Sequence, residues 1–305
     1  MKILVTGGAG FIGSHLVDAL IEKKHRVVVI DDLSLGQKRN LNKKAKFYRL
    51  DVQSERIEAV FKKEQFDYVF HLAAQINVRK SVADPIFDAK VNIIGTLNLL
   101  ECCQKYKIRK FIFASSGGVM YGDTKIIPTP ESQPARPISP YGISKHSVEQ
   151  YLGYYKKEFG LDYTILRYAN VYGPRQNPEG EAGVIAIFLS KLLKGEGPII
   201  NGDGKQTRDY VFVKDVVRAN VLGLTKKGNL YNIGTGKETN VIELFEKIRQ
   251  LGNFAAKEKH GPALRGEQKR SCLDSSKIRK EWGFRSKYDL TTGISETLEW
   301  FKDRI

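Results

Sequence analysis

The chain has 305 residues, 41% of them hydrophobic and 28% charged, which suffices for one large α/β domain with a smaller domain attached, or for two domains. No apolar run approaches the roughly 20 residues that cross a bilayer, and no secretory signal precedes the first apolar segment. The three cysteines have neither disulfide-framework nor zinc-site spacing. We therefore expect a globular, cytoplasmic protein without a metal site.

The charge is strongly basic. Fifty Lys and Arg residues stand against 34 Asp and Glu residues, which gives a net charge of +16. The basic residues are spread along predicted solvent-facing segments, as at Lys23-Lys24 and Lys156-Lys157, so a solvated surface is the first interpretation. Such a charge also attracts phosphate-bearing substrates. Because no single basic block dominates, a nucleic-acid partner is less expected.

A glycine-rich turn follows the first predicted strand, residues 2–6, and leads into a helix predicted over residues 14–23. In this setting Gly7 permits the tight turn, Gly10 lets the backbone approach a pyrophosphate, and Gly13 allows the helix to pack closely on the sheet. The N–H groups at the helix start then face the diphosphate. The pattern predicts a dinucleotide site; the alternative is a doubly wound domain without a nucleotide.

The next predicted strand, residues 26–30, ends at Asp31. A carboxylate at this place accepts hydrogen bonds from the 2′-hydroxyl of an adenosine ribose and repels a 2′-phosphate. The sequence therefore predicts NAD as the cofactor in preference to NADP.

Strands and helices continue to alternate. We predict strands over residues 46–50, 68–72 and 110–114, and helices over residues 56–63 and 92–106. This alternation predicts an α/β fold built on a doubly wound parallel sheet. Ligands gather at the carboxyl ends of such strands, which is where the following residues lie: Asp31, Asp51, Val52, Ala73, Ala74, Gln75 and Ser116.

Tyr141 and Lys145 stand four residues apart just inside a predicted helix. Positions i and i+4 share one helix face, and a free phenol, with a pKa of about 10, is a poor base at neutral pH. A neighbouring ammonium, or the positive charge of an oxidised nicotinamide ring, lowers that pKa. Tyr141 then becomes a candidate general base. Taken alone, the pair also fits an ordinary amphipathic helix.

The ordered segments TGGAGFIGSH, FHLAAQ, FASSGGVMYG, SPYGISK, LRYANVYGPR, DGKQTRDYVFVKDV and YNIGTG cover almost the whole chain. In order and spacing they resemble the extended short-chain dehydrogenase/reductases, in particular the bacterial and archaeal UDP-glucose 4-epimerases. TGGAGFIG and Y-x-x-x-K are typical of the superfamily, whereas the segments after residue 165 indicate sugar nucleotides.

The resemblance implies roles for three residues. Tyr141 would take the proton of the sugar 4-hydroxyl, Lys145 would hold the nicotinamide ribose, and Ser116 would hydrogen-bond the same hydroxyl. The 4-keto sugar left by hydride transfer to NAD would turn over and receive the hydride on its other face. The implied reaction inverts carbon 4 of a UDP-hexose, UDP-glucose or UDP-galactose, without net oxidation.

The resemblance also implies the remaining contacts. The expected cofactor residues, besides Tyr141 and Lys145, are Gly7, Gly10, Phe11, Ile12, Gly13, Asp31, Asp32, Ser34, Gly36, Asp51, Val52, Leu72, Ala73, Ala74, Gln75, Asn92, Tyr168 and Val171. The expected substrate residues, besides Ser116 and Tyr141, are Asn170, Ala182, Gly183, Val184, Asn201, Arg208 and Arg265. Asp215 and Asn232 are expected to hold loops together.

Three places refine this assignment. Related dehydratases and decarboxylases carry acidic residues after the Ser/Thr, where this chain has Gly117 and Gly118. Where the family has an R-x-G-D motif, this chain has Leu264-Arg265-Gly266-Glu267, so the arginine is displaced by one position or a small gap shifts the alignment. Ser271 aligns with a position where a tyrosine excludes N-acetylated sugars in some relatives, so UDP-N-acetylhexosamines are alternative substrates.

The expected organisation is a Rossmann domain over residues 1–169, which also receives a segment near residues 209–233, and a smaller α/β substrate domain over residues 170–305. Family resemblance implies a homodimer through helices near residues 92–106 and 144–159. A UDP-pentose or UDP-uronate 4-epimerase is a second enzymatic hypothesis. A non-catalytic NAD-binding protein with a nucleic-acid or protein partner is a third.

Overall fold

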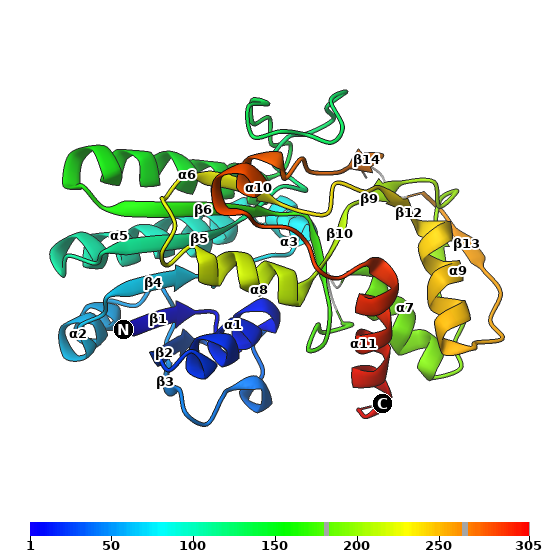
Figure 1. Ribbon diagram of the computed structural model, residues 1–305, viewed down its shortest axis with the longest axis horizontal. Coiled ribbons are helices and arrows are strands. Elements are labelled where there is room, and N and C mark those ends of the chain that lie inside the picture. The colour runs from blue at the N-terminus through cyan, green and yellow to red at the C-terminus, as the bar shows by residue number, and fades with distance from the viewer. Residues whose placement is uncertain (180–182, 264–267, 305) are drawn as a thin grey trace. The chain divides into compact units, whose positions relative to one another are not determined.

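The computed structural model describes residues 1–179, 183–263 and 268–304. Its contacts divide the chain into two compact units, both drawn in Figure 1. The first unit contains residues 1–120, 135–167 and 217–231, and the second contains residues 121–134, 168–216 and 232–305. The chain therefore passes between the units several times.

A seven-stranded sheet has the strand order β11-β6-β5-β4-β1-β2-β3. The chain places β2 and β3 on one side of β1 and β4 to β6 on the other, so the strand order reverses between β1 and β4, the usual place for a ligand in this fold. The pairings of β1, β2, β3, β4 and β5 are parallel. The predicted doubly wound fold is confirmed. The strands are β1 (Lys2–Thr6), β2 (Arg26–Asp31), β3 (Lys46–Arg49), β4 (Tyr68–His71), β5 (Lys110–Ser116), β6 (Asp162–Tyr168) and β11 (Leu230–Ile233).

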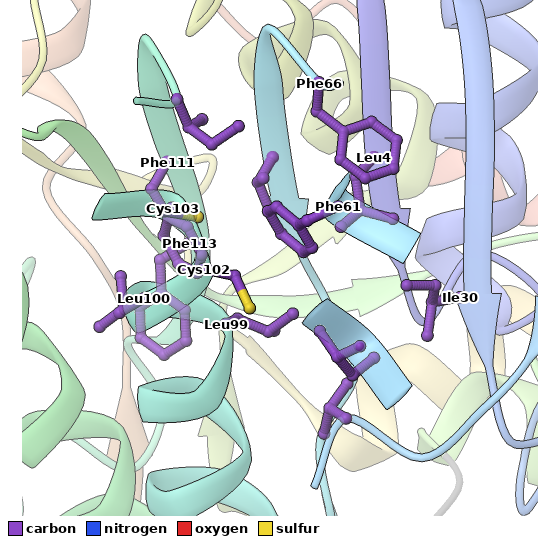
Figure 2. Packing of buried hydrophobic residues seen from close by; sticks show 14 of the residues in the cluster. Leu4, Ile30, Phe61, Phe66, Leu99, Leu100, Cys102, Cys103, Phe111 and Phe113 are labelled. Atoms are coloured by element: carbon purple, nitrogen blue, oxygen red, sulfur yellow. The ribbon is translucent and has the colours of Figure 1, made fainter. Parts of the chain in front are cut away.

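Buried side chains from β1, β2 and β5 pack against two helices, α2 (Arg56–Glu64) and α5 (Gly95–Lys105), in one apolar cluster (Figure 2). Phe61 of α2 is fully buried and packs edge-to-face on Phe66. Cys102 and Cys103 of α5 belong to the same cluster, and burial raises the pKa of Cys102 to about 11. These cysteines therefore act as small apolar residues.

Two short helices that were not predicted from the sequence precede α5. They are α3 (Val78–Ala83) and α4 (Pro85–Ala89), and a π-helical stretch, Lys90–Ile94, joins α4 to α5. Each short helix has a side-chain N-cap: Asn77 accepts from the Lys80 N–H, and Asp84 from the Phe87 N–H. The signals were present in the sequence, because Asn and Asp are preferred N-caps, but the segments are too short to show a helical period.

The first unit also contains α1 (Phe11–Glu22) and α6 (Pro140–Phe159), and α8 (Val213–Leu222) lies mostly in it. The second unit contains α7 (Val184–Leu193), α9 (Val241–Gly252), α10 (Ser276–Trp282) and α11 (Leu290–Lys302). Its strands form three small sheets: β7 (Asn170–Tyr172) with β10 (Tyr210–Phe212), β8 (Ile199–Asn201) with β13 (Lys259–Gly261), and β9 (Thr207–Arg208) between β12 (Thr239–Asn240) and β14 (Arg270–Ser271).

Asp215 and Asn232 hold loops of the second unit, as expected. The Asp215 carboxylate accepts the backbone N–H groups of Lys287 and Tyr288. The Asn232 side chain donates to the Thr129 carbonyl and accepts from the Tyr121 hydroxyl. Both residues are fully or almost fully buried, so their polar groups are satisfied within the protein.

The turn between β1 and α1 is closed so tightly that two of its positions leave no space for a side chain. A Cβ atom on Gly13 would lie 2.1 Å from the carbonyl oxygen of Gly7. Gly7 itself has φ +70° and a Cβ there would lie 2.6 Å from the Ala73 nitrogen. Backbone is the obstacle at both positions, so a larger residue must displace the loop.

We predict that Gly13→Ala lowers the free energy of unfolding by about 2 kcal/mol or more, because the added methyl group overpacks a closed turn. Gly153→Ala in α6 is the matched control: its Cβ meets nothing within 4 Å, and replacing a helical glycine should stabilise the fold by about 0.5–1 kcal/mol. Urea unfolding measures both changes. Equal effects of the two substitutions would contradict the steric account.

Candidate active site

Helix α6 has a defined start, which places Tyr141 in its first turn. Ser139 is the N-cap and its hydroxyl accepts from the Gly142 N–H at 3.2 Å. Pro140 is the first helical residue, where a missing N–H costs nothing. The N–H of Tyr141 donates to the hydroxyl of Ser81 in α3 at 3.2 Å. The backbone of Tyr141 is therefore held by groups on two elements.

Lys145 lies one turn further along α6 and is 4% exposed. Its ammonium donates to the carbonyl oxygen of Ala114 at 2.9 Å. The same Nζ lies 5.8 Å from the centroid of the Tyr141 ring and 4.7 Å from that of Phe113. Since Ala114 is two residues before Ser116 in β5, this contact brings the helix carrying Tyr141 and Lys145 against the strand that ends at Ser116.

The electrostatics of the pair differ from the expectation in one respect. Burial raises the pKa of the Tyr141 phenol well above its ordinary value, and the negative charge of Asp88 acts in the same direction. Burial also lowers the pKa of Lys145 to about 8, against the opposing effects of Asp88 and Glu149. The expected lowering of the tyrosine pKa by Lys145 alone was therefore wrong. A further positive charge beside the phenol, such as an oxidised nicotinamide, would act in the required direction.

Ser115 and Ser116 have different surroundings although they are neighbours. The Ser115 hydroxyl donates to Glu149 of α6 at 2.6 Å, and Glu149 is also paired with Arg167 of β6. Successive residues of a strand point to opposite faces of the sheet. The buried contacts of Ser115 therefore leave the Ser116 side chain on the other face of β5, where it is partly exposed.

Asp31 ends β2 beside the glycine-rich turn. Its carboxylate accepts the N–H of Ala9 and the N–H of Leu33, both at 2.9 Å. Burial raises the pKa of this carboxyl, whereas the two backbone hydrogen bonds act to lower it. A carboxylate has about four lone-pair sites, so Asp31 can still accept a ribose hydroxyl. A Cβ on Gly36 would come within 2.6 Å of the same carboxylate.

Other expected cofactor residues line the loops after β2, β3 and β4. Asp32 accepts from the N–H and hydroxyl of Ser34, and Asp51 accepts from the N–H of Gln53. Asn92 is buried, and its amide exchanges two hydrogen bonds of 2.9 Å with the backbone of Gln75. Asn92 therefore shapes the loop after β4 in this structure.

These residues fit an NAD molecule. The turn at Gly7 and Gly13 brings backbone to a place that a Cβ would fill, as a pyrophosphate cradle requires. Asp31 stands at the end of the neighbouring strand, and small residues, Ala73 and Ala74, follow β4. Phe11 and Ile12 open helix α1, and the N–H groups at the start of a helix can bind a phosphate.

The expected residues of the second unit lie on its strands and at a helix start. Tyr168 ends β6, and Asn170 and Val171 lie in β7, where the Asn170 N–H donates to the Asp209 carbonyl. Arg208 lies in β9 and Asn201 ends β8. Gly183 is the N-cap of α7, and Val184 its first residue. Ala182 and Arg265 lie outside the described residues.

The structure adds residues that sequence reasoning missed: Ser81, Asp88, Ser115 and Glu149. All four are buried, and each contacts α6 or belongs to it. No periodic pattern marks them, because their partners lie far away in the chain.

In the part of the chain that the structure describes, no cluster of His, Cys, Asp and Glu can hold a metal ion, and no helix is long and apolar enough to cross a membrane.

Comparison with known proteins agrees with this geometry. A putative UDP-glucose 4-epimerase of Methanocaldococcus jannaschii is 47% identical over 301 residues, which cover 99% of this chain and 98% of the relative. The crystal structure of a Thermotoga maritima UDP-glucose 4-epimerase with UDP-glucose matches with a TM-score of 0.98 and 50% identity, covering 99% of both chains.

A UDP-N-acetylglucosamine 4-epimerase from Methanobrevibacter ruminantium, solved in complex with UDP-N-acetylmuramic acid, matches with a TM-score of 0.95 and 38% identity, covering 100% of this chain and 99% of that one. The model of the NAD dependent epimerase/dehydratase family matches residues 3–234. With its glycine-rich turn, Asp31 and the Tyr141–Lys145 pair on this fold, the chain belongs to the NAD dependent epimerase/dehydratase family.

Proposed function

We propose that the protein is an NAD-dependent 4-epimerase of UDP-hexoses that interconverts UDP-glucose and UDP-galactose. The observation that carries this proposal is the placement of Tyr141 and Lys145 on one helix, with the lysine bonded to the strand that ends at Ser116. A putative UDP-glucose 4-epimerase and a solved UDP-glucose 4-epimerase each match over almost the whole chain, which supports this substrate class.

In the proposed reaction, Tyr141 removes the proton of the sugar 4-hydroxyl and Ser116 hydrogen-bonds the same oxygen. Bound NAD supplies the hydride acceptor, and its positive ring favours the phenolate. Lys145 adds a second positive charge near that phenolate and can donate to a ribose hydroxyl, since an ammonium has three donors. The hydride returns to the opposite face of carbon 4 and Tyr141 gives the proton back to the oxygen, so carbon 4 is inverted without net oxidation.

Gly117 and Gly118 support epimerisation against dehydration. A dehydratase must move protons at carbons next to the 4-position, which requires an acid and a base besides the tyrosine. Directly after Ser116 this chain has two glycines, which carry no titratable side chain. The family is named for both epimerases and dehydratases, and the two glycines favour epimerisation.

We further propose that the first unit binds NAD and that the second unit holds the UDP part of the substrate. Asn170 and Arg208 are the proposed diphosphate contacts. A guanidinium can bind phosphate oxygens through two parallel hydrogen bonds. Arg208 lies in the central strand of a small three-stranded sheet, and the two neighbouring strands fix the position of its backbone.

UDP-N-acetylhexosamines are a second candidate substrate. Ser271 is directly opposite Arg208 in the pairing of β14 with β9. Paired residues of neighbouring strands point to the same face of a sheet, so a small side chain lies beside the proposed diphosphate arginine. A relative with 38% identity is a UDP-N-acetylglucosamine 4-epimerase.

The proposed assembly is a homodimer in the cytoplasm. Ile143, Tyr151 and Tyr154 are exposed apolar or aromatic residues on α6, and Ile94 is exposed just before α5. Exposed apolar side chains gathered on helices suit a helix-to-helix interface with a second copy. The three cysteines are free and buried, which is compatible with a reducing compartment.

Tyr141→Phe should lower the turnover of UDP-galactose to UDP-glucose by about 10²–10⁴, because the variant keeps the ring and loses the base. Chromatography of the nucleotide sugars after incubation without added NAD measures this, since the cofactor is regenerated in each cycle. Turnover in the variant equal to that of the wild type would contradict the assignment of the base.

Ser271→Tyr should raise the preference for UDP-galactose over UDP-N-acetylgalactosamine by about 10-fold or more, because a bulky ring would occupy the space needed by the acetyl group. The ratio of kcat/KM values for the two substrates measures it. Ser271→Thr, which adds one methyl group, is the matched control. The same ratio in wild type and Ser271→Tyr would show that this position does not select the sugar.

Tyr151→Glu should convert the dimer into a monomer at micromolar concentration, because it places a charge in the proposed apolar interface. Ile126→Glu changes a similarly exposed apolar residue that belongs to neither α5 nor α6 and should leave the dimer intact. Sedimentation velocity distinguishes the two species. A wild-type protein that sediments as a monomer would refute the proposed assembly.

A further inference from the structure

Asp88, in the short helix α4, is a buried carboxylate that the proposed reaction does not use. It is 0% exposed. Its Oδ1 atom accepts from Nε2 of Gln75 at 2.8 Å and from Nδ2 of Asn92 at 3.0 Å. Its Oδ2 atom accepts from the hydroxyl of Ser144 at 2.6 Å. Each of these three partners is a neutral group, so these hydrogen bonds do not compensate the negative charge.

These partners connect the loop after β4 to the start of helix α6. The side-chain amide of Asn92 fixes that loop, because it accepts from the N–H of Gln75 and donates to the carbonyl of Gln75. Ser144 lies directly before Lys145 and one turn after Tyr141. A shift of Asp88 would therefore displace both the loop after β4 and the first turns of α6.

The charge of Asp88 acts on Lys145 and Tyr141. Burial lowers the pKa of Lys145 to about 8, and the negative charges of Asp88 in α4 and Glu149 in α6 oppose this effect. His71 of β4 also faces Lys145, but burial lowers its pKa to about 3, so it is neutral near pH 7. Glu149 is already paired with Arg167. Asp88, by contrast, has only neutral side chains as hydrogen-bond partners among the residues that the structure describes.

We propose that Asp88 is a positioning residue that ties the first turns of α6 to the loop after β4 and supplies a buried negative charge for Lys145. Its effect on catalysis rests on the proposed epimerase function, whereas the charge coupling does not. The negative charges of two carboxylates near the buried ammonium of Lys145 keep this lysine protonated at neutral pH. Its proposed part in the reaction requires this protonated form.

Asp88→Asn tests the charge with little change of shape. The asparagine Oδ1 can accept from Gln75 and Asn92, and its Nδ2 can donate to the Ser144 hydroxyl, which is also an acceptor. Without the negative charge, the pKa of Lys145 should fall further below its ordinary value. The pKa of Tyr141 should fall as well, because Asp88 now raises it.

The first measurement is the pH profile of kcat with UDP-galactose. The acid limb, set by Tyr141, and the alkaline limb, set by Lys145, should both move to lower pH by about one unit in Asp88→Asn. Ser144→Ala removes the hydrogen bond between Ser144 and Asp88 and keeps the negative charge of Asp88. It should therefore lower kcat by about tenfold and leave both limbs of the profile at the same pH as in the wild type. A merely structural defect would lower the rate without moving either limb.

Glu64→Gln is the matched control. Glu64 is also a buried carboxylate with three side-chain partners, Lys2, Lys46 and Tyr48. It lies at the opposite ends of the strands, beside the first residues of β1 and β3. Its substitution should leave the pH profile and kcat unchanged.

The second measurement needs neither substrate nor cofactor. Urea unfolding at pH 7 of wild type, Asp88→Asn, Lys145→Met and the double variant gives the coupling between the two charges. Lys145→Met should lower the unfolding midpoint more in the wild-type background than in Asp88→Asn, where the ammonium has lost a counter-charge. Lys145→Met and Glu64→Gln should combine additively.

Additive effects of Asp88→Asn and Lys145→Met would overturn the charge coupling. Wild-type pH limits in Asp88→Asn would overturn its role in the reaction, and wild-type kcat in Ser144→Ala would overturn the tie. If the wild-type protein failed to convert any UDP-sugar, the proposed function would fall, while the unfolding cycle would still decide whether Asp88 supports Lys145.

Discussion

The burial of the Lys145 ammonium is the constraint on which the site depends. An ammonium removed from water is stable only where acceptors and negative charges replace the solvent. The structure provides the carbonyl of Ala114 at 2.9 Å, the face of the Phe113 ring, and two carboxylates, Asp88 and Glu149. Even so, burial lowers the pKa of Lys145 to about 8, so the compensation is partial and each contribution matters at neutral pH.

The two carboxylates have different structural tasks. Glu149 accepts from Arg167 and Ser115, and so fixes α6 against β5 and β6. Asp88 accepts from Ser144, from Gln75 in the loop after β4, and from Asn92 in the π-helical stretch before α5. Removing a partner from a buried network leaves an unsatisfied group, which costs more than an average hydrogen bond contributes. Contacts from several elements therefore fix the position of Tyr141 at the same time.

Local patterns were sufficient for most of the fold. Short apolar runs, the glycine-rich turn and the Ser139-Pro140 start of α6 are signals contained within a few residues, and the structure has strands and helices at those places. The Tyr141–Lys145 spacing likewise put both side chains on one helix face. These features depend on backbone periodicity and capping, which the sequence displays directly.

What the sequence did not reveal depends on contacts between distant residues. Asp88 and Ser144 are 56 residues apart, and Ser115 and Glu149 are 34 apart, so neither pair forms a pattern along the chain. The direction of the Tyr141 pKa was wrong for the same reason. The i, i+4 rule shows the nearby ammonium, but burial and the charge of Asp88 appear only once the chain is folded.

In the second unit a buried carboxylate, Asp209, supports the strand that carries Arg208, the proposed phosphate contact. Asp209 follows Arg208 directly and is 1% exposed. It accepts the N–H groups of Thr235, Gly236 and Leu273, so it fastens two loops to the end of the short strand β9. Strand β9 has only two residues, and such a strand gains its rigidity from its neighbours. Because Ser271 is paired with Arg208 on the adjoining strand, the proposed phosphate contact and the proposed sugar-selecting position share one face of one small sheet. A change in either loop held by Asp209 should therefore act on binding and on sugar selection together, even without a direct contact to the substrate.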